Sequence, residues 1–237
     1  FYGDSLDIMR ELPDNSVDAV ITDPPYNIGY ADWDLFKHIE EVAYQWNRLL
    51  TKDGSLFCFC GWSFVTEVIC NISNIKDLRL NDWIIYDRVK GRGGKRRLVS
   101  TREDLLWYVK SDNWTFNKAN AYSTIKKKTG GLGLKNGQSN RALSNVWTDI
   151  SPIVPWSSER NIHPTQKPVQ LMERIVSVFT NENDIVLDSF MGSGTTGVAC
   201  MNLNRRFVGI ELDKEYFQLA EQRIQTAQNQ THEILMG

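Results

Sequence analysis

The sequence has no long apolar run and no pattern of metal-binding or paired cysteines. None of its 237 residues falls in a stretch approaching the roughly 18 apolar residues that a membrane-spanning helix requires. No secretory signal peptide is visible, although the chain starts at Phe1 rather than at a methionine. The four cysteines, Cys58, Cys60, Cys70 and Cys200, form no C-x-x-C pair and no convincing disulfide framework. We therefore expect buried free thiols, no bound metal and a location in the reducing cytoplasm.

The composition, with 41% hydrophobic and 24% charged residues, is that of an ordinary globular protein. Its length suits one sizeable α/β domain with an insertion. The net charge of −2 hides an asymmetry, because residues 88–141 hold 14 Lys or Arg and three acids, a net +11, which leaves −13 on the rest. A basic segment on an acidic body is typical of a face that binds a polyanion. A solvated basic loop without a partner is an equally good interpretation of this feature alone.

The N-terminal half contains alternating strand and helix signals. Residues 17–22 are a mostly β-branched run that ends before two prolines, which predicts a buried strand with Asp23 at its carboxyl end. The following elements are expected as a helix at 36–50 and strands at 55–60, 83–86 and 105–109. A turn is expected at 52–54, and glycine-rich basic stretches at 91–97 and 126–137 predict two flexible loops.

The C-terminal third alternates between helices and strands. Its expected elements are a helix at 168–179, a strand at 185–188, a glycine turn into a helix ending at 202, a strand at 206–211 and a helix at 214–225. Asp213 stands where it can cap the last helix. Strands separated by helices predict a parallel sheet that is covered on both faces.

A glycine turn and an acidic residue mark the carboxyl ends of two predicted strands, where open α/β sheets bind ligands. Gly192 and Gly194 allow the backbone to approach a ligand closely, because neither carries a Cβ. Glu211 ends the next strand, where a carboxylate can accept hydrogen bonds from two ribose hydroxyls. The pattern is neither GxGxxG nor a phosphate loop, so it favours a nucleoside without phosphates. The alternative is a tight strand-to-helix turn that binds nothing.

The tetrapeptide Asp23-Pro24-Pro25-Tyr26 follows the first predicted strand and is conformationally restricted by its prolines. Its groups suit the methylation of an aromatic amine, whose lone pair is delocalised into the ring. Acceptors on both N–H bonds would favour a tetrahedral nitrogen, and the Asp23 carboxylate and the Pro24 carbonyl can supply them. Tyr26 can stack on the base. The alternative is a rigid proline turn with no catalytic role.

These two motifs together resemble those of the amino-methyltransferases of DNA. The tetrapeptide comes first, the basic insertion follows, and the segment 188–194, Asp-Ser-Phe-Met-Gly-Ser-Gly, comes last. That order resembles the β group of DNA adenine-N6 methyltransferases, many of which belong to restriction–modification systems. The segment 163–168, His-Pro-Thr-Gln-Lys-Pro, strengthens the match, since the family carries such a segment just before the cofactor glycines.

The resemblance implies a Rossmann-like fold that binds S-adenosylmethionine, with a seven-stranded, mainly parallel sheet and helices on both faces. It implies a catalytic and cofactor-binding domain from 1–87 and 151–237, and a target-recognition region at 88–150. The cofactor-binding residues that it implies are Asp4, Ser5, Asp23, Thr165, Lys167, Asp188, Phe190, Gly192, Gly194, Thr195, Thr196 and Glu211. In this set Glu211 would hold the ribose and Asp4 would approach the adenine moiety. Ser189 stands where proline is frequent in the family, and we expect little effect from it.

The resemblance also bears on the target. Asp at position 23 favours adenine, since the cytosine-N4 members more often carry serine there. A DNA cytosine-N4 or RNA amino-methyltransferase is the alternative enzyme, and a non-catalytic DNA-binding regulator on the same fold is the third interpretation. Cytosine-C5 methylation needs a cysteine nucleophile, typically after proline, and the sequence has no Pro-Cys dipeptide.

Double-stranded DNA is the expected partner, and its target base must leave the stack to reach a pocket at a sheet edge. The residues expected to contact phosphates and base edges are Arg88, Lys90, Arg92, Lys95, Arg96 and Arg97. A cognate restriction endonuclease is expected as a functional partner, and homodimerisation is left open.

Overall fold

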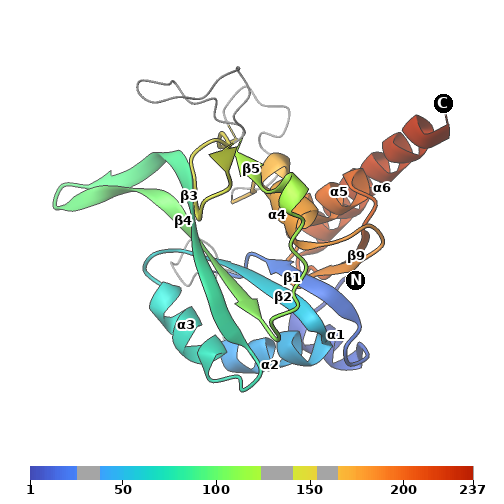
Figure 1. The fold of residues 1–237 in the computed structure, drawn as a ribbon, viewed down its shortest axis with the longest axis horizontal. Helices are drawn as coiled ribbons and strands as arrows, with labels where there is room; N and C mark the ends of the chain where they lie inside the picture. Colours follow the sequence, from blue (N-terminus) through green and yellow to red (C-terminus); the bar gives the residue numbers. More distant parts are fainter. Residues whose placement is uncertain (26–37, 124–140, 154–164, 237) are drawn as a thin grey trace.

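The computed structural model describes residues 1–25, 38–123, 141–153 and 165–236. These residues contain a seven-stranded sheet with the strand order β7-β3-β4-β2-β1-β8-β9 (Figure 1). The strands of this sheet are β1 (Val17–Thr22), β2 (Leu50–Cys60), β3 (Arg79–Gly94), β4 (Arg97–Val109), β7 (Val146–Trp147), β8 (Ile185–Asp188) and β9 (Arg206–Gly209). Within this sheet, β4 is antiparallel to its two neighbours, β2 and β3. The other four pairings are parallel, which confirms the mainly parallel sheet that the sequence predicts. A separate two-stranded ribbon joins β5 (Tyr122–Ser123) to β6 (Arg141–Ala142).

Helices cover both faces of the sheet. They are α1 (Ser5–Glu11), α2 (Ile39–Leu49), α3 (Val65–Ser73), α4 (Val169–Phe179), α5 (Thr195–Asn202) and α6 (Lys214–Met236), with a 3₁₀ turn η1 (Lys118–Asn120). One apolar core joins α1, α2 and α3 to one face, and a second core joins α4 and α5 to the other (Figure 1). Side chains of β2 alternate between the two, with Leu56 in the first core and Phe57 in the second. Burial on both faces explains why β1 and β2 are apolar at consecutive positions.

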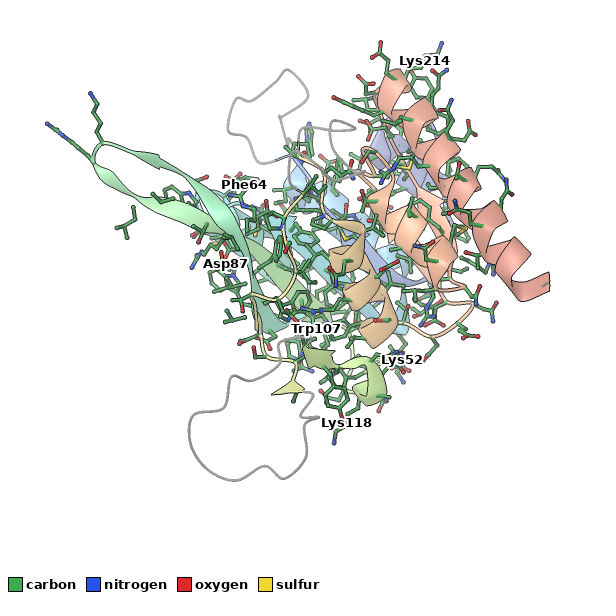
Figure 2. The ribbon with its side chains drawn as sticks, turned by 90° about the horizontal axis from the view of Figure 1, so that it is seen from above. Lys52, Phe64, Asp87, Trp107, Lys118 and Lys214 are labelled. Atoms are coloured by element: carbon green, nitrogen blue, oxygen red, sulfur yellow. The ribbon has the colours of Figure 1, made fainter. Side chains whose placement is uncertain are left out.

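The predicted loop at 91–97 is instead the end of a long β3–β4 hairpin that projects from the body (Figures 1 and 2). Arg92 pairs with Ser100 and Gly94 with Arg97, so only two residues make the turn. Residues 98–101 can form a strand because they are rich in β-branched and small side chains. The register shifts between Asp87 and Arg92, and this irregularity includes Val89 with φ 63°. The glycines at 91–94 predict a loop from sequence because loops and bulged hairpins both use them.

Other segments differ from expectation in their limits. The expected turn at 52–54 lies inside β2, where Val17 pairs with Leu50 and Ala19 with Ser55, so the extra residues of β2 form a bulge. The last helix continues past its expected end to Met236, and its start is capped by Asp213, which accepts from the amides of Glu215 and Tyr216 at 2.8 and 3.0 Å. The loop predicted at 126–137 lies outside the described residues.

Three of the four cysteines are buried free thiols, as expected. Cys70 is exposed, which corrects the prediction, because it lies on the solvent side of α3, a helix not expected from the sequence. In the parts of the chain that the structure describes, no three metal-ligating side chains are grouped as a metal site would need. None of the helices described is both long and apolar enough to cross a membrane.

Candidate active site

The sequence-predicted motifs meet at the carboxyl ends of three neighbouring parallel strands. Asp23 follows β1, Asp188 ends β8, and Glu211 lies just beyond β9. The edge where parallel strands end is where open α/β sheets bind ligands. The N-terminal segment joins the same edge, since the Gly3 amide donates to the Glu211 carbonyl at 2.9 Å.

Asp188 is the buried centre of this edge. Its Oδ1 accepts hydrogen bonds from the Thr22 hydroxyl at 3.0 Å and the Phe190 amide at 3.2 Å, and its Oδ2 accepts from the Thr196 hydroxyl at 2.6 Å. Burial raises the pKa of Asp188 to about 7, although the hydrogen bonds from Thr196, Phe190 and Thr22 oppose the shift. The carboxyl group therefore ties the end of β1 to the glycine turn and to the start of α5.

Ser189 is held by three other elements. Its hydroxyl accepts from the Trp46 indole of α2 at 2.9 Å and lies 3.3 Å from the Thr22 hydroxyl. Its carbonyl accepts from the Ser5 hydroxyl at the start of α1. A proline at this position would lack the hydroxyl that binds Trp46, so serine here adds a link between the turn and the helices on one face.

The glycine turn and Glu211 form one unit. Gly192 and Gly194 have φ of 50° and 75°, in the left-handed region that favours glycine. A Cβ on Gly194 would come within 2.8 Å of the Ala220 Cβ on α6. The Gly192 amide donates to Glu211 Oε2 at 2.8 Å, and the Asp213 amide donates to Oε1 at 2.8 Å. Burial raises the pKa of Glu211, and these two amide hydrogen bonds oppose the shift.

Asp23 is paired with a buried lysine. Its carboxylate binds the ammonium group of Lys167, which comes just before α4 and has only 5% of its side chain exposed, against 18% for Asp23. The Lys167 Nζ also lies 5.1 Å from the centre of the Phe59 ring. Burial lowers the pKa of Lys167, but the charges of Asp23 and Glu103 outweigh it and leave the pKa above its ordinary value.

The pairing extends to two residues of the hairpin strands. Lys167 Nζ lies 3.4 Å from Glu103 Oε2 on β4, and Glu103 Oε1 lies 3.1 Å from Arg88 Nη1 on β3. Asp23, Lys167, Glu103 and Arg88 thus form a chain of alternating charge, which we call the ion chain. No local pattern in the sequence singles out Glu103, because its partners are brought to it only by the pairing of β3 with β4 and by the position of α4.

The remaining predicted residues have distinct positions. Asp4 caps α1 by accepting from the amides of Leu6 and Asp7 at 2.8 and 3.2 Å. Thr195 is buried, Thr165 is exposed, and Phe190 is partly buried. Pro24 is buried beside Asp23 and Pro25 is partly buried, whereas Tyr26 lies outside the described residues.

The basic residues expected to contact DNA divide by position. Lys95 and Arg96 are exposed at the hairpin turn, and Arg88 is partly exposed on β3. The backbones of Lys90, Arg92 and Arg97 belong to β3 and β4, while their side chains lie outside the described part.

Known proteins resemble this chain over most of its length. Residues 17–222 match the family described as DNA methylase. The Type II methyltransferase M.HpaI of Haemophilus parainfluenzae is 32% identical over 235 residues, which cover 95% of this chain and 73% of that protein. The DNA adenine methyltransferase YhdJ of Escherichia coli (strain K12) is 31% identical over 258 residues, with 99% and 85% covered. The crystal structure of the M1.HpyAVI–SAM complex matches with a TM-score of 0.66 and 35% identity, over 94% of this chain and 97% of that one.

Proposed function

This chain belongs to the DNA methylase family, and from that membership we propose that it transfers a methyl group from S-adenosylmethionine to the N6 amino group of adenine in double-stranded DNA. The observation that carries the proposal is the position of Asp23, which lies at the end of β1 directly beside the Asp188 turn. An acceptor for an amino group and a turn suited to a nucleoside are therefore neighbours on one sheet edge.

The residues around the glycine turn suit S-adenosylmethionine. Glu211 is partly exposed, and its carboxylate oxygens, which accept from the amides of Gly192 and Asp213, keep lone pairs for ribose hydroxyls. Gly192 and Gly194 keep the turn free of Cβ atoms, and Phe190 offers a partly buried ring. When bound, S-adenosylmethionine supplies a methyl carbon whose bond to the sulfonium sulfur breaks, with the electron pair passing to sulfur, as the amino nitrogen attacks.

The chain's own part in the transfer is to prepare the amino group. The Asp23 carboxylate accepts one N–H bond of the amine, and the Pro24 carbonyl accepts the other, which favours a tetrahedral nitrogen with a free lone pair. One amino proton leaves in the reaction, and the Asp23 carboxylate is placed to take it. A thiol nucleophile has no part in this chemistry, and burial raises the pKa of Cys58 and Cys60 above the ordinary value, so both stay protonated.

The hairpin supports DNA as the substrate. Its turn carries Lys95 and Arg96, and Leu98 beside them is 93% exposed. Within 88–150, β4 lies between β3 and β2 in the main sheet and so belongs to the core of the domain. We therefore restrict the proposed target-recognition region to the projecting part of the hairpin and the segment after β4. The proposed catalytic and cofactor-binding domain then comprises 1–87 and 151–237 together with the part of β4 that pairs with β2. The target adenine flips out of the duplex to reach Asp23.

The wider setting follows from the substrate. A Type II methyltransferase name among the relatives supports a cognate restriction endonuclease as a functional partner that acts on the same DNA site. A DNA substrate supports a location in the cytoplasm. Light scattering of the purified chain would measure its molar mass and show whether it forms a homodimer.

The experiment that tests the target is the methylation of unmodified DNA with labelled S-adenosylmethionine, followed by digestion to nucleosides. N6-methyladenine in the DNA is the expected product. N4-methylcytosine in the DNA would instead show a cytosine-N4 methyltransferase. Label transferred to RNA would show an RNA amino-methyltransferase. DNA binding without any methylated nucleoside would show a non-catalytic regulator.

A further inference from the structure

The ion chain links the residue that meets the target base to a residue that can meet the DNA backbone. Asp23 stands at one end, at the carboxyl end of β1. Arg88 stands at the other, on β3 near the base of the hairpin, with 37% of its side chain exposed. Between them lie Lys167 and Glu103, with 5% and 11% of their side chains exposed. The two inner charges are therefore shielded from solvent, where their interactions are strong.

Lys167 occupies an acceptor that the proposed reaction needs. Its ammonium group binds Asp23 Oδ2, so that oxygen is engaged before any target base arrives. An amino group of the target competes with the ammonium group for the same carboxylate. The ammonium group needs a second anion close by if Asp23 is to be released without leaving a buried charge unpaired.

Glu103 is that second anion. Its Oε2 lies 3.4 Å from Lys167 Nζ, longer than a good hydrogen bond, and no other described residue donates to it. Two more buried polar atoms on the neighbouring strand β3, Tyr86 OH and Arg88 Nε, have no hydrogen-bond partner among the described residues. Tyr86 is opposite Glu103 in the β3–β4 register. Glu103 Oε2 therefore keeps the capacity to accept a full hydrogen bond from Lys167, and a small movement of the ammonium group towards it would supply that bond.

We propose that Glu103 and Lys167 are positioning residues that couple DNA binding by Arg88 to the release of Asp23. When a DNA phosphate binds the Arg88 guanidinium, the ion pair between Arg88 and Glu103 Oε1 breaks. The Glu103 carboxylate then attracts the Lys167 ammonium group more strongly. Lys167 then moves from Asp23 to Glu103 Oε2, and the Asp23 carboxylate becomes free to accept the amino group. No covalent bond is made or broken in this step: Lys167 keeps Glu103 as its anion, Arg88 pairs with the phosphate, and the Asp23 carboxylate accepts the amino group in place of the ammonium group.

This inference rests on the proposed function, in which Asp23 is the acceptor, and substitutions in the ion chain test it separately. Glu103→Gln removes the alternative anion, so kcat should fall at least tenfold, while the KM for DNA and the Kd for S-adenosylmethionine stay within about threefold. Arg88→Gln should raise the KM for DNA and leave kcat at saturating DNA within about threefold. A kcat of Glu103→Gln within twofold of the wild type would overturn the proposal.

The double variant Glu103→Gln/Lys167→Met distinguishes coupling from a structural role. If Glu103 acts only by drawing Lys167 away, the double variant should be no slower than Lys167→Met alone, since there is no ammonium left to move. Losses that multiply would mean that Glu103 supports the fold independently, and would overturn the proposal. If Glu103→Gln fails to fold, Glu103→Asp replaces it: its carboxylate is farther from Lys167, so its kcat should fall below wild type, and adding Lys167→Met should remove that loss.

Asp104 supplies the matched control. It neighbours Glu103 on β4, is fully buried and pairs with Arg102 at 3.3 Å, but it lies on the opposite face of the strand, beside Trp83. Asp104→Asn should lower stability while kcat stays within about twofold. Equal losses of kcat in Asp104→Asn and Glu103→Gln would contradict a specific role for Glu103. Activity retained by Asp23→Asn would instead overturn the role of Asp23 as the acceptor, and a wild-type enzyme that forms no N6-methyladenine would overturn the proposed function itself.

Discussion

The backbone amide of Gly192 donates a hydrogen bond to the side chain of Glu211 across 2.8 Å, from the turn after β8 to the end of β9. The carboxylate thus orients the glycine turn on the same edge where it can receive a ribose. A change at Glu211 should therefore affect the methyl-donor site without reaching the DNA-binding hairpin.

We expect Glu211→Ala to weaken S-adenosylmethionine binding by about 10- to 100-fold. This range follows from hydrogen bonds to a charged group, each of about 1.5–3 kcal/mol, of which some are replaced by water. Isothermal titration calorimetry with the cofactor alone measures the change. Affinity for DNA in the absence of cofactor is the internal control and should not change. A Kd within twofold of the wild type would remove Glu211 from the cofactor site.

Asp188 should make the stability of the ligand-free protein depend on pH. Burial raises its pKa in the folded protein to about 7, above the value of about 3.8 expected when unfolded. The folded form therefore holds the proton more tightly, so its contribution is complete below about pH 4 and is lost as the pH rises through 7. The loss is at most about 1.4 kcal/mol per pH unit.

The measurement for Asp188 is urea denaturation at several pH values between about 5 and 8, the interval in which its folded-state carboxyl group ionises. Asp188→Asn cannot ionise, so the free energy of unfolding of this variant should fall less over that interval than that of the wild type. Parallel pH profiles for the two proteins would show that Asp188 is already ionised at the acid end of the interval in the folded state.

The hairpin turn should contribute to DNA affinity by neutralising phosphates. Replacing Lys95 and Arg96 together with alanine should weaken binding and lower the slope of log K against log salt by about 0.9 for each phosphate that is no longer neutralised. Lys52→Ala/Lys76→Ala is the charge-matched control, since both lysines are exposed near the opposite edge of the sheet. Binding isotherms at several salt concentrations give both slopes. Equal slopes for the two double variants would remove the hairpin turn from the interface.

The parts of the site that the sequence predicts are those defined by local patterns. Asp23 and Glu211 each follow a short apolar run, and strand ends in a parallel sheet meet at one edge, so their proximity can be inferred from alternating strands and helices. Proline at 24 and 25 restricts the backbone locally, and glycine at 192 and 194 frees it. Because these effects are local, the sequence predicts the rigid turn and the glycine turn as well.

The parts that the sequence does not predict depend on residues distant in the chain. Lys167 binds Asp23 across 144 residues, and Glu103 reaches Lys167 only because β4 lies between β2 and β3. The sequence predicts a loop in place of the hairpin because glycine and basic residues weaken strand signals, whereas cross-strand pairing of Arg92 with Ser100 stabilises it. Register and side-chain pairing are tertiary properties, and single-residue patterns do not encode them.

The most direct test of the central claim is methyl transfer by Asp23→Asn in a single turnover, with cofactor and DNA affinities measured on the same preparation. Asparagine keeps the size of the side chain and removes the carboxylate that should accept the amino group. We predict that transfer to adenine falls at least 100-fold, about 2.7 kcal/mol in the barrier, while both affinities stay within about threefold. Transfer at a near-normal rate by this variant would contradict the assignment of Asp23 as the acceptor.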